Sequence, residues 1–315
     1  MGENEVLIFG MHFNINPVAF VLPIGQNGWK IQWYGVLIAF GFLLAVIYGA
    51  RYAKRFNIDF DRLLDVIIVT APVAILCARA YYVIFDGKPL KSFGEFFGVG
   101  TDSGISGLAI YGGVIGAAVC GTLMCRLKKI KVLDALDLAA LGFLIGQGIG
   151  RWGNFTNQEA FGTFTGSSFW GMQSNNTIDY MKGYGLVHPC FLYESIWCIA
   201  GFFVLHFLAN RRKFSGQISL YYCVWYGFGR AIIETLRTDS LMIGPIRVSC
   251  LLSAVACVAA AVALVLIDKR MKEEKAALVY SGVFSDDETE EEAEEEPTEE
   301  TNEESEADIK EEENE

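Results

Sequence analysis

The sequence lacks the residue patterns that hold most metal and redox centres. None of its eight cysteines forms a C-x-x-C pair, and nearly all lie in apolar stretches, where cysteine is most often a small buried hydrophobe. Only three histidines are present, and they are scattered along the chain. The sequence therefore predicts neither a histidine-rich metal site nor a redox centre.

The N-terminal region lacks the pattern of a cleavable signal peptide. Its first residues carry no basic segment, and Pro17, Pro23, Gly25 and Gly28 interrupt its apolar stretches. We expect residues 1–31 to form an interfacial segment that leads into the first membrane span.

Basic residues are nearly absent from the acidic C-terminal end. Residues 284–315 hold 19 of the 37 acidic residues but only one of the 25 basic ones. They contribute −18 to the formal net charge of −12, which leaves the rest of the chain at +6, as suits a protein among anionic lipids. Residues 269–315 are predicted to be a disordered cytoplasmic tail, because their composition cannot bury a core.

Long apolar stretches dominate the remainder. Hydrophobic residues make up 52% of the chain and the mean hydropathy is +0.33, values typical of a polytopic membrane protein. A span needs about 20 apolar residues. The stretches that qualify run approximately over residues 33–50, 64–85, 104–125, 133–150, 190–208, 218–236 and 246–267. The predicted fold is all-α, with about seven transmembrane helices forming a catalytic membrane domain over residues 32–268.

The distribution of lysine and arginine predicts the orientation. Segments after the first, third, fifth and seventh stretches are rich in basic residues, and the intervening segments are poorer. Because basic loops stay in the cytoplasm, the N-terminus is expected outside and the C-terminus in the cytoplasm. The long segment 151–189 would then lie outside, where an exported substrate arrives.

Ionisable residues interrupt two predicted spans, where buried charge is costly and usually marks function. Arg79 lies late in the second span. Arg230, Glu234 and Arg237 lie in the sixth, on one predicted helical face, so that Glu234 is able to pair with both arginines. A network that only ties helices together is one interpretation. With Arg151 nearby, however, arginine outnumbers carboxylate, which favours an anionic ligand such as a lipid phosphate.

A dense polar motif, GRWGNFTNQEAFG, begins where the fourth span ends and covers residues 150–162. It contains Arg151, Asn154, Asn157 and Glu159. Its glycines let the backbone approach a ligand closely, and its amides are able to donate to phosphate or ester oxygens. A helix cap and turn would explain the glycines but not this concentration of Arg, Asn and Glu.

A glycine-rich stretch over residues 104–116 opens the third predicted span. Small residues at this density favour close helix contact, and packing explains them as well as function does. Tyr111 is the exception, because a phenol among glycines is able to face a cavity.

These motifs resemble those of the prolipoprotein diacylglyceryl transferase family. Residues 150–162 are similar to the family signature, in which Arg, Gly, Asn-Phe, Asn, Glu and a final Gly recur at these spacings. The other matches follow in the family's order: Trp33-Tyr34-Gly35, His188-Pro189 with Leu192-Tyr193-Glu194, and the helix of Arg230, Glu234 and Arg237. The resemblance covers roughly residues 32–267.

The resemblance implies a multi-pass enzyme of the bacterial cytoplasmic (inner) membrane with its active site toward the outer face. Such an enzyme transfers the diacylglyceryl group of phosphatidylglycerol to the lipobox cysteine thiol in the signal peptide of a prolipoprotein. A thioether forms and glycerol phosphate is released. The expected partners are these substrates and membrane lipid, with no nucleic acid, no metal and no other cofactor.

The resemblance also assigns residues to the expected site. We place Arg151, Arg230, Tyr111 and Glu159 in the catalytic group, with Arg151 and Arg230 as a clamp on the phosphate. The expected substrate-binding residues, beside Arg151 itself, are Asn154, Asn157, Gly162, Tyr34, Arg79, Glu234 and Arg237.

One position departs from the family pattern. Most members have His-Gly-Gly where this chain has Tyr111-Gly112-Gly113, and that histidine is often assigned as the base for the thiol. A phenol with an ordinary pKa of about 10 is a poor base unless arginine lowers the pKa. Either Tyr111 positions the lipid or relays a proton, or the base lies elsewhere. His188 is expected to cap a helix or lie at an interface.

Two other functions fit parts of the pattern. Ser106 in Gly104–Gly107 supplies the G-x-S-G of a rhomboid-like intramembrane serine protease, with only His188 and His206 as candidate partners. Buried Arg and Glu within seven spans are compatible with a small-molecule transporter, but no inverted repeat is visible. The general base, the lipid route, the oligomeric state, the prolipoprotein set and the role of the tail are open.

Overall fold

The protein is described by a computed structural model of the full chain. The described residues are 4–23, 28–86, 96, 107–238, 242–243 and 246–280. The chain divides into two compact units, Met1–Ala261 and Val262–Glu315. The first unit contains the polar motif at residues 150–162 and the helices that surround it.

Seven long helices occur in the described residues, each at a predicted apolar stretch. They are α1 (Trp33–Tyr52), α2 (Phe60–Asp86), α4 (Ile110–Leu127), α5 (Val132–Thr156), α7 (Cys190–Ala209), α8 (Gln217–Leu236) and α9 (Val248–Tyr280). Six of them are long and apolar enough to cross a membrane, and α8, which carries Arg230 and Glu234, is not among the six. The all-α polytopic prediction is confirmed, and the number of spans stays a prediction.

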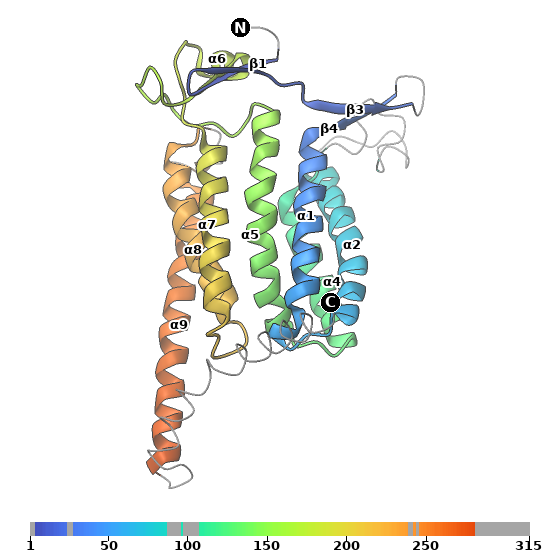
Figure 1. The fold of residues 1–315 in the computed structure, drawn as a ribbon, viewed down its shortest axis with the longest axis vertical. Helices are drawn as coiled ribbons and strands as arrows, with labels where there is room; N and C mark the ends of the chain where they lie inside the picture. The colour runs from blue at the N-terminus through green and yellow to red at the C-terminus, as the bar shows by residue number, and fades with distance from the viewer. Residues whose placement is uncertain are drawn as a thin grey trace, which may run out of the picture. The chain divides into compact units, whose positions relative to one another are not determined.

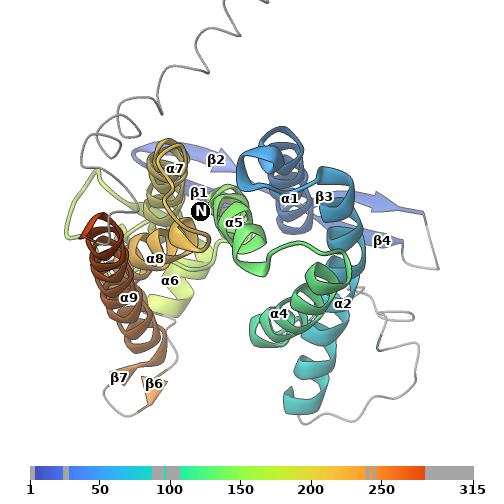
Figure 2. The same ribbon diagram turned by 90° about the horizontal axis from the view of Figure 1, so that it is seen from below.

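Helix α5 is the central helix of the bundle, packed against α1, α7 and α8, while α2 pairs with α4 (Figure 2). Glycine allows close approach in two of these pairs, α1 with α5 and α2 with α4. A Cβ on Gly41 of α1 would lie 3.2 Å from the Cα of Gly146 on α5, and one on Gly116 of α4 would overlap Cys77 of α2. The glycine-rich start of α4 is therefore explained by helix packing.

Short strands gather at one end of the bundle, which we call the strand end (Figure 1). Strands β1 (Glu5–Ile8), β2 (Met11–Asn14) and β5 (Met172–Ser174) form an antiparallel sheet in the order β2-β1-β5. The other short strands form two hairpins, β3 (Val18–Leu22) with β4 (Trp29–Gln32) and β6 (Met242–Ile243) with β7 (Ile246–Arg247).

The three-stranded sheet joins two segments that the sequence analysis treated separately. Leu7 of the N-terminal segment pairs with Gln173 of segment 151–189. Val6, Met172 and Phe191 share a small buried apolar cluster beneath them. Helix α6 (Asn175–Met181) follows β5, and Ser174 with Thr177 forms its capping box.

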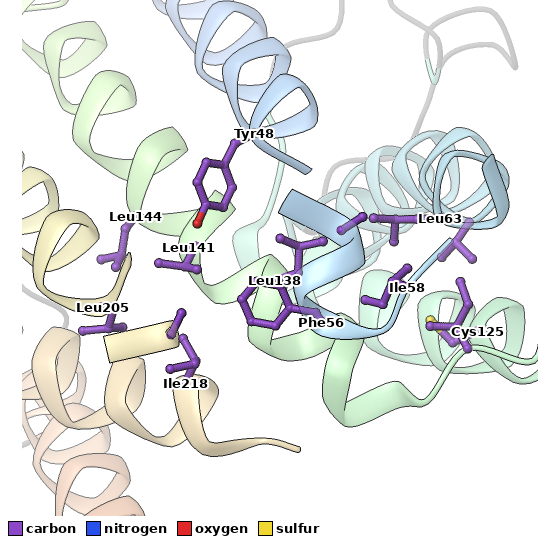
Figure 3. Close-up of a cluster of buried hydrophobic side chains, with 14 of the residues drawn as sticks. Tyr48, Phe56, Ile58, Leu63, Cys125, Leu138, Leu141, Leu144, Leu205 and Ile218 are labelled. Atoms are coloured by element: carbon purple, nitrogen blue, oxygen red, sulfur yellow. The ribbon is translucent and has the colours of Figure 1, made fainter. Parts of the chain in front are cut away.

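The main apolar core lies toward the opposite end, which we call the connection end (Figure 3). Leu138, Leu141 and Leu144 of α5 are buried at its centre. Side chains from six other segments surround them, including Tyr48, Phe56 of η1 (Ala53–Phe56), Leu63, Cys125, Leu205 and Ile218. Deep burial of this many apolar side chains makes this end the rigid base of the bundle.

A buried ion cluster at the connection end fastens α5 to α8 and to the segment between α7 and α8. We call Arg212, Asp134 and Asp137 the Arg212 cluster. The Arg212 guanidinium lies 3.0 Å from a carboxylate oxygen of each aspartate. Asp137 also accepts hydrogen bonds from the backbone N–H groups of Gly216 and Ser219, at 2.8 and 2.7 Å. Its carboxylate therefore caps the N-terminus of α8, where negative charge is favoured.

The second unit begins within α9, and its described part is helical to Tyr280. Residues 269–280, assigned to the disordered tail from sequence, are thus helical. The physical reason is favourable i,i+4 pairing, as between Lys269 and Glu273 and between Arg270 and Glu274. Residues 281–315 lie outside the described part of the chain.

Candidate active site

Three arginine side chains converge on one carboxylate at the strand end. Glu194 of α7 lies 2.6 Å from Arg151 of α5, 2.7 Å from Arg230 of α8 and 3.1 Å from Arg237 just beyond α8. The Glu194 side chain is only 3% exposed. One buried carboxylate therefore holds three guanidinium groups from three segments in one place.

Two further residues complete this group. Glu234 pairs with Arg230 at 2.8 Å, which confirms the predicted i,i+4 pair. Arg247 of β7 donates a hydrogen bond to the backbone carbonyl of Glu234. We call these residues the Glu194 cluster: Arg151, Glu194, Arg230, Glu234, Arg237 and Arg247.

The Glu194 cluster contains more cations than anions. Among the described residues, three of its arginines pair with two carboxylates, Glu194 and Glu234, and the fourth, Arg247, donates to a backbone carbonyl. Placing guanidinium groups where water is scarce is costly unless an anion compensates them. The surplus therefore leaves the cluster ready to bind an anion such as a phosphate.

Arg237 does not lie on the helical face predicted for it. Helix α8 ends at Leu236, and Arg237 has extended backbone angles of φ −71° and ψ 147°. A β-bridge to Gly162 then directs the chain, and the Arg237 side chain reaches Glu194. The predicted helical face does not include Arg237 because the helix ends one residue before it.

The sequence analysis missed two members of the cluster. Glu194 was not predicted to be a site residue, although a carboxylate inside an apolar stretch is itself a signal of function. Arg247 lies at the edge of the last apolar stretch, and only the β6–β7 hairpin brings it back to Glu234. Its position could not be read from local sequence.

A tryptophan pair fixes α7 against α8 beside the cluster. The indole N–H of Trp197 donates to the carbonyl of Trp225, and that of Trp225 donates to the carbonyl of Trp197, both at 3.0 Å. The rings stack with centroids 4.5 Å apart. Gly201 and Gly229 provide the space, because a Cβ at either position would overlap a ring. This packing holds Glu194 and Arg230 at pairing distance.

The polar motif at residues 150–162 forms a hydrogen-bonded chain leading away from the cluster. Arg151 donates to the Asn154 side-chain oxygen at 3.4 Å, and the Asn154 amide donates to Oε1 of Glu159 at 2.9 Å. The amide of Asn157 donates to the same Oε1 at 3.4 Å. The structure thus brings together four predicted site residues: Arg151, Asn154, Asn157 and Glu159.

The backbone on both sides of Glu159 is in the left-handed region. Gln158 has φ 55° and Ala160 has φ 57°. Such conformations cost about 1–2 kcal/mol for residues other than glycine and tend to persist at functional sites. Both residues are buried, so the surrounding structure holds the Glu159 carboxylate in its position.

Gly162 and Gly153 are required by close packing. A Cβ on Gly162 would lie 2.8 Å from the Cβ of His188 and 2.9 Å from the carbonyl oxygen of Leu236. A Cβ on Gly153 would overlap the ring of Tyr34. Tyr34 therefore packs directly on the polar motif, with its phenol in electrostatic range of Arg151 and Glu159.

Two predicted site residues lie on the other side of α5. Arg79 of α2 donates to the carbonyl oxygens of Phe96 and Gly107, each at 3.1 Å. Tyr111, on the first turn of α4, is 53% exposed. Helices α2 and α4 flank α5 opposite α7 and α8 (Figure 2). The structure therefore brings Arg151, Arg230 and Arg237 together as expected but does not place Arg79 with them.

The histidines occupy separate places in the fold. His206 lies near the connection end, where its Nδ1 is 2.8 Å from the Tyr48 hydroxyl. His188 lies 3.1 Å from the Tyr193 hydroxyl and does not cap α7, whose N-cap is Pro189 without a side-chain bond. Ser106, the serine of the protease alternative, lies outside the described residues.

A phenol lies beside the arginines on the bundle side of the cluster. Tyr226, one turn before Arg230, is in electrostatic range of Arg151 and Arg230. Its ring stacks on that of Tyr222, with an interplanar angle of 7°. The amide of Gln147 on α5 donates to the Tyr222 hydroxyl at 2.8 Å. Polar contacts thus continue from the cluster between α5 and α8.

Comparison with known proteins agrees with this arrangement. A family model described as prolipoprotein diacylglyceryl transferase matches residues 18–266. A phosphatidylglycerol–prolipoprotein diacylglyceryl transferase of Clostridium novyi is 43% identical over 251 residues, covering 76% of this chain and 91% of that protein. The enzyme of the same name from Pediococcus pentosaceus is 42% identical over 266 residues, covering 82% and 92%. That of Clostridioides difficile is 39% identical over 259 residues, covering 81% and 96%.

These matches extend across every helix that contributes to the Glu194 cluster and across the polar motif attached to it. By the extent of the matched region and the level of identity, the chain is a member of the prolipoprotein diacylglyceryl transferase family.

Proposed function

We propose that this bacterial integral membrane protein transfers the diacylglyceryl group of phosphatidylglycerol to the cysteine thiol of a prolipoprotein. The observation that carries the proposal is the surplus of guanidinium groups in the Glu194 cluster. The phosphodiester of phosphatidylglycerol is the anion that such a surplus would bind. The acceptor is the lipobox cysteine at the end of the signal peptide.

The chemistry requires stabilisation of charge on the leaving group. The sulfur electron pair forms a C–S bond to the glyceryl carbon, and the C–O bond to phosphate breaks with its electrons on oxygen. The phosphodiester monoanion thereby becomes a glycerol phosphate dianion. Arg151 and Arg230, as the phosphate clamp, stabilise the developing second charge in a site with little water. The thiol proton leaves with solvent or with the phosphate product.

The carboxylates of the site orient the clamp. Glu194 and Glu234 hold the Arg230 guanidinium from two directions, at 2.7 and 2.8 Å. Asn154 links Arg151 to Glu159 and holds headgroup oxygens of the lipid. Because these contacts exist before substrate binds, little reorganisation is needed when charge develops.

A relay for the thiol proton is proposed at the strand end of the bundle. Tyr111 opens α4 at this end and relays the thiol proton as the lipid binds between α4 and the clamp. A phenol relays this proton efficiently only if a nearby arginine stabilises its phenolate form. Arg79 of the neighbouring α2 supports the lipid on that side.

The strand end faces the outside of the cytoplasmic membrane. The basic connections around residues 51–62, 126–131 and 211–213 all lie at the opposite end of the bundle (Figure 1). Basic connections are retained in the cytoplasm. The membrane domain over residues 32–268 therefore presents its site to exported polypeptides, and the acidic tail is cytoplasmic.

The direct test is transfer by the purified protein. Phosphatidylglycerol labelled in its diacylglyceryl group is mixed with a lipobox peptide, and the label should appear on the peptide in a thioether that resists hydroxylamine. Glycerol phosphate should form in equal amount. A peptide that is cleaved but not labelled would support the protease alternative, and uptake of a small molecule without lipid turnover would support the transporter.

A further inference from the structure

A cavity of about 230 Å³ lies beside the polar motif, on the strand-end side of the Glu194 cluster. Its walls come from three segments that are distant in sequence: the motif itself, α6, and the residue that follows Arg237. The lining residues used below are Glu159, Phe161, Asn176, Tyr180 and Thr238. None of them belongs to a membrane-spanning helix.

The cavity walls are built by specific contacts. The Tyr180 ring meets that of Phe161 edge to face, with centroids 5.4 Å apart, and the Tyr180 hydroxyl donates to the carbonyl of Thr238 at 3.2 Å. The Thr238 hydroxyl donates to the carbonyl of Phe161 at 3.2 Å. The amide of Asn176 donates to the backbone carbonyl of Asn157 at 3.3 Å. These bonds hold the three segments around one space.

Glu159 adds a carboxylate to the lining of the cavity. Asn154 and Asn157 both donate to Oε1 of Glu159. Among the described residues, Oε2 of Glu159 has no hydrogen-bond partner. The left-handed backbone at Gln158 and Ala160 keeps this carboxylate in place. The cavity therefore offers aromatic walls together with one strong acceptor.

We propose that this cavity binds the residues that follow the lipidated cysteine in the prolipoprotein, an inference that rests on the proposed transferase function. A polypeptide supplies both a side chain for the aromatic wall and an N–H donor for the free carboxylate oxygen. Thr238 adjoins Arg237 of the Glu194 cluster, so the cavity begins where a chain attached to the reacting sulfur continues outward. A phospholipid enters from the bilayer instead, and its charged headgroup is held by the arginines.

The test compares two amidated peptides in a transfer assay with the full-length protein in detergent. The long peptide continues several residues past the cysteine, and the short one ends at it; amidation removes the terminal charge from both. With the wild-type enzyme, the KM of the long peptide should be lower by about tenfold, as expected when one well-packed side chain is removed from an interface. Equal KM values for the two peptides with the wild-type enzyme would by themselves overturn the proposal.

Variants locate the effect in the cavity. Tyr180→Ala should raise the KM of the long peptide by about fivefold to tenfold and leave those of the short peptide and of phosphatidylglycerol within about twofold. Tyr180→Phe, which keeps the ring, should behave nearly as wild type. Tyr184→Ala is the control, because Tyr184 is 87% exposed and outside the cavity.

Other outcomes separate this proposal from the function on which it rests. If Tyr180→Ala weakens both peptides equally, the residue acts only in folding and the cavity proposal is wrong. If it raises the KM of phosphatidylglycerol alone, the cavity holds the lipid headgroup. If the wild-type enzyme labels neither peptide, the transferase function itself fails, and the cavity proposal fails with it.

Discussion

The Arg212 cluster and the Glu194 cluster both combine arginine with buried carboxylates but differ in how their charges are balanced. In the Arg212 cluster, one guanidinium faces two carboxylates, and backbone N–H groups of Gly216 and Ser219 supply the remaining donors. The Asp137 carboxylate accepts hydrogen bonds from both of these backbone groups, from the Ser219 hydroxyl and from Arg212. Such a cluster fastens helices and has no need of a ligand.

The Glu194 cluster has the opposite balance. Three of its arginines share two carboxylates and Arg247 donates to a backbone carbonyl. These cations come from α5, from α8 and from the segments that follow it. Burial alone does not distinguish the two clusters, because Asp137 and Glu194 are both almost fully buried. Within the described part of the chain, the distinguishing feature is the surplus of cations, which favours the binding of an anion.

The largest expected effect tests the clamp directly. Arg151→Lys and Arg230→Lys should each lower kcat/KM by about 100-fold to 1,000-fold, because an ammonium group cannot contact two phosphate oxygens in a fixed plane. Lipidation of the peptide is measured at several phosphatidylglycerol concentrations. The matched control is Arg212→Lys, which makes the same exchange in the Arg212 cluster and should affect thermal stability but not turnover. Wild-type rates in both clamp variants would refute the clamp.

The next effect tests the shared carboxylate. Glu194→Gln removes the common partner of three guanidinium groups but leaves their charge available to phosphate. We expect kcat to fall by about 10-fold to 100-fold through loss of orientation, while the KM for phosphatidylglycerol does not rise. A higher KM with unchanged kcat would mean that Glu194 contributes to lipid affinity rather than to the geometry of the clamp.

Much of the fold could be predicted from the sequence, because span length and apolar composition are local properties. The seven long helices coincide with the predicted stretches. The pairing of Leu7 with Gln173 could not be predicted, since short strands distant in sequence carry no local signal of their partner. The helix over residues 269–280 was missed because its charge suggested disorder, whereas its i,i+4 pairs favour helix.

The site was predictable to the extent that its chemistry is local. The pair Arg230–Glu234 follows from a spacing of four on one helix, and the contacts of Asn154 and Asn157 with Glu159 lie within one short motif. Convergence on Glu194 depends on how α5, α7 and α8 pack. For the same reason Arg79, which is equally unusual in an apolar stretch, lies on the other side of α5.

A smaller effect is expected at Tyr111. Tyr111→Phe should lower kcat by about tenfold if the phenol relays the thiol proton, a loss at the lower end of those for acid–base groups. Tyr111→His should restore the rate, with a pH dependence set by an imidazole of ordinary pKa of about 6.5. The pH–rate profiles of the three enzymes are compared. A Phe variant with the wild-type profile would show that the half-exposed phenol only contacts lipid.

The smallest effect on chemistry, and the sharpest contrast with Glu194, is expected at Asp137. Asp137→Asn removes a carboxylate that accepts from Arg212, Gly216 and Ser219, so the N-terminus of α8 loses its negative charge and the free energy of unfolding should fall by about 2–4 kcal/mol. Because Asp134 still neutralises Arg212, kcat/KM per folded molecule should stay within about twofold of wild type. Thermal unfolding in detergent and the transfer assay measure the two quantities on one preparation. A large loss of turnover in the folded variant would mean that the connection end controls the arginines through α8, and that the two clusters are not independent.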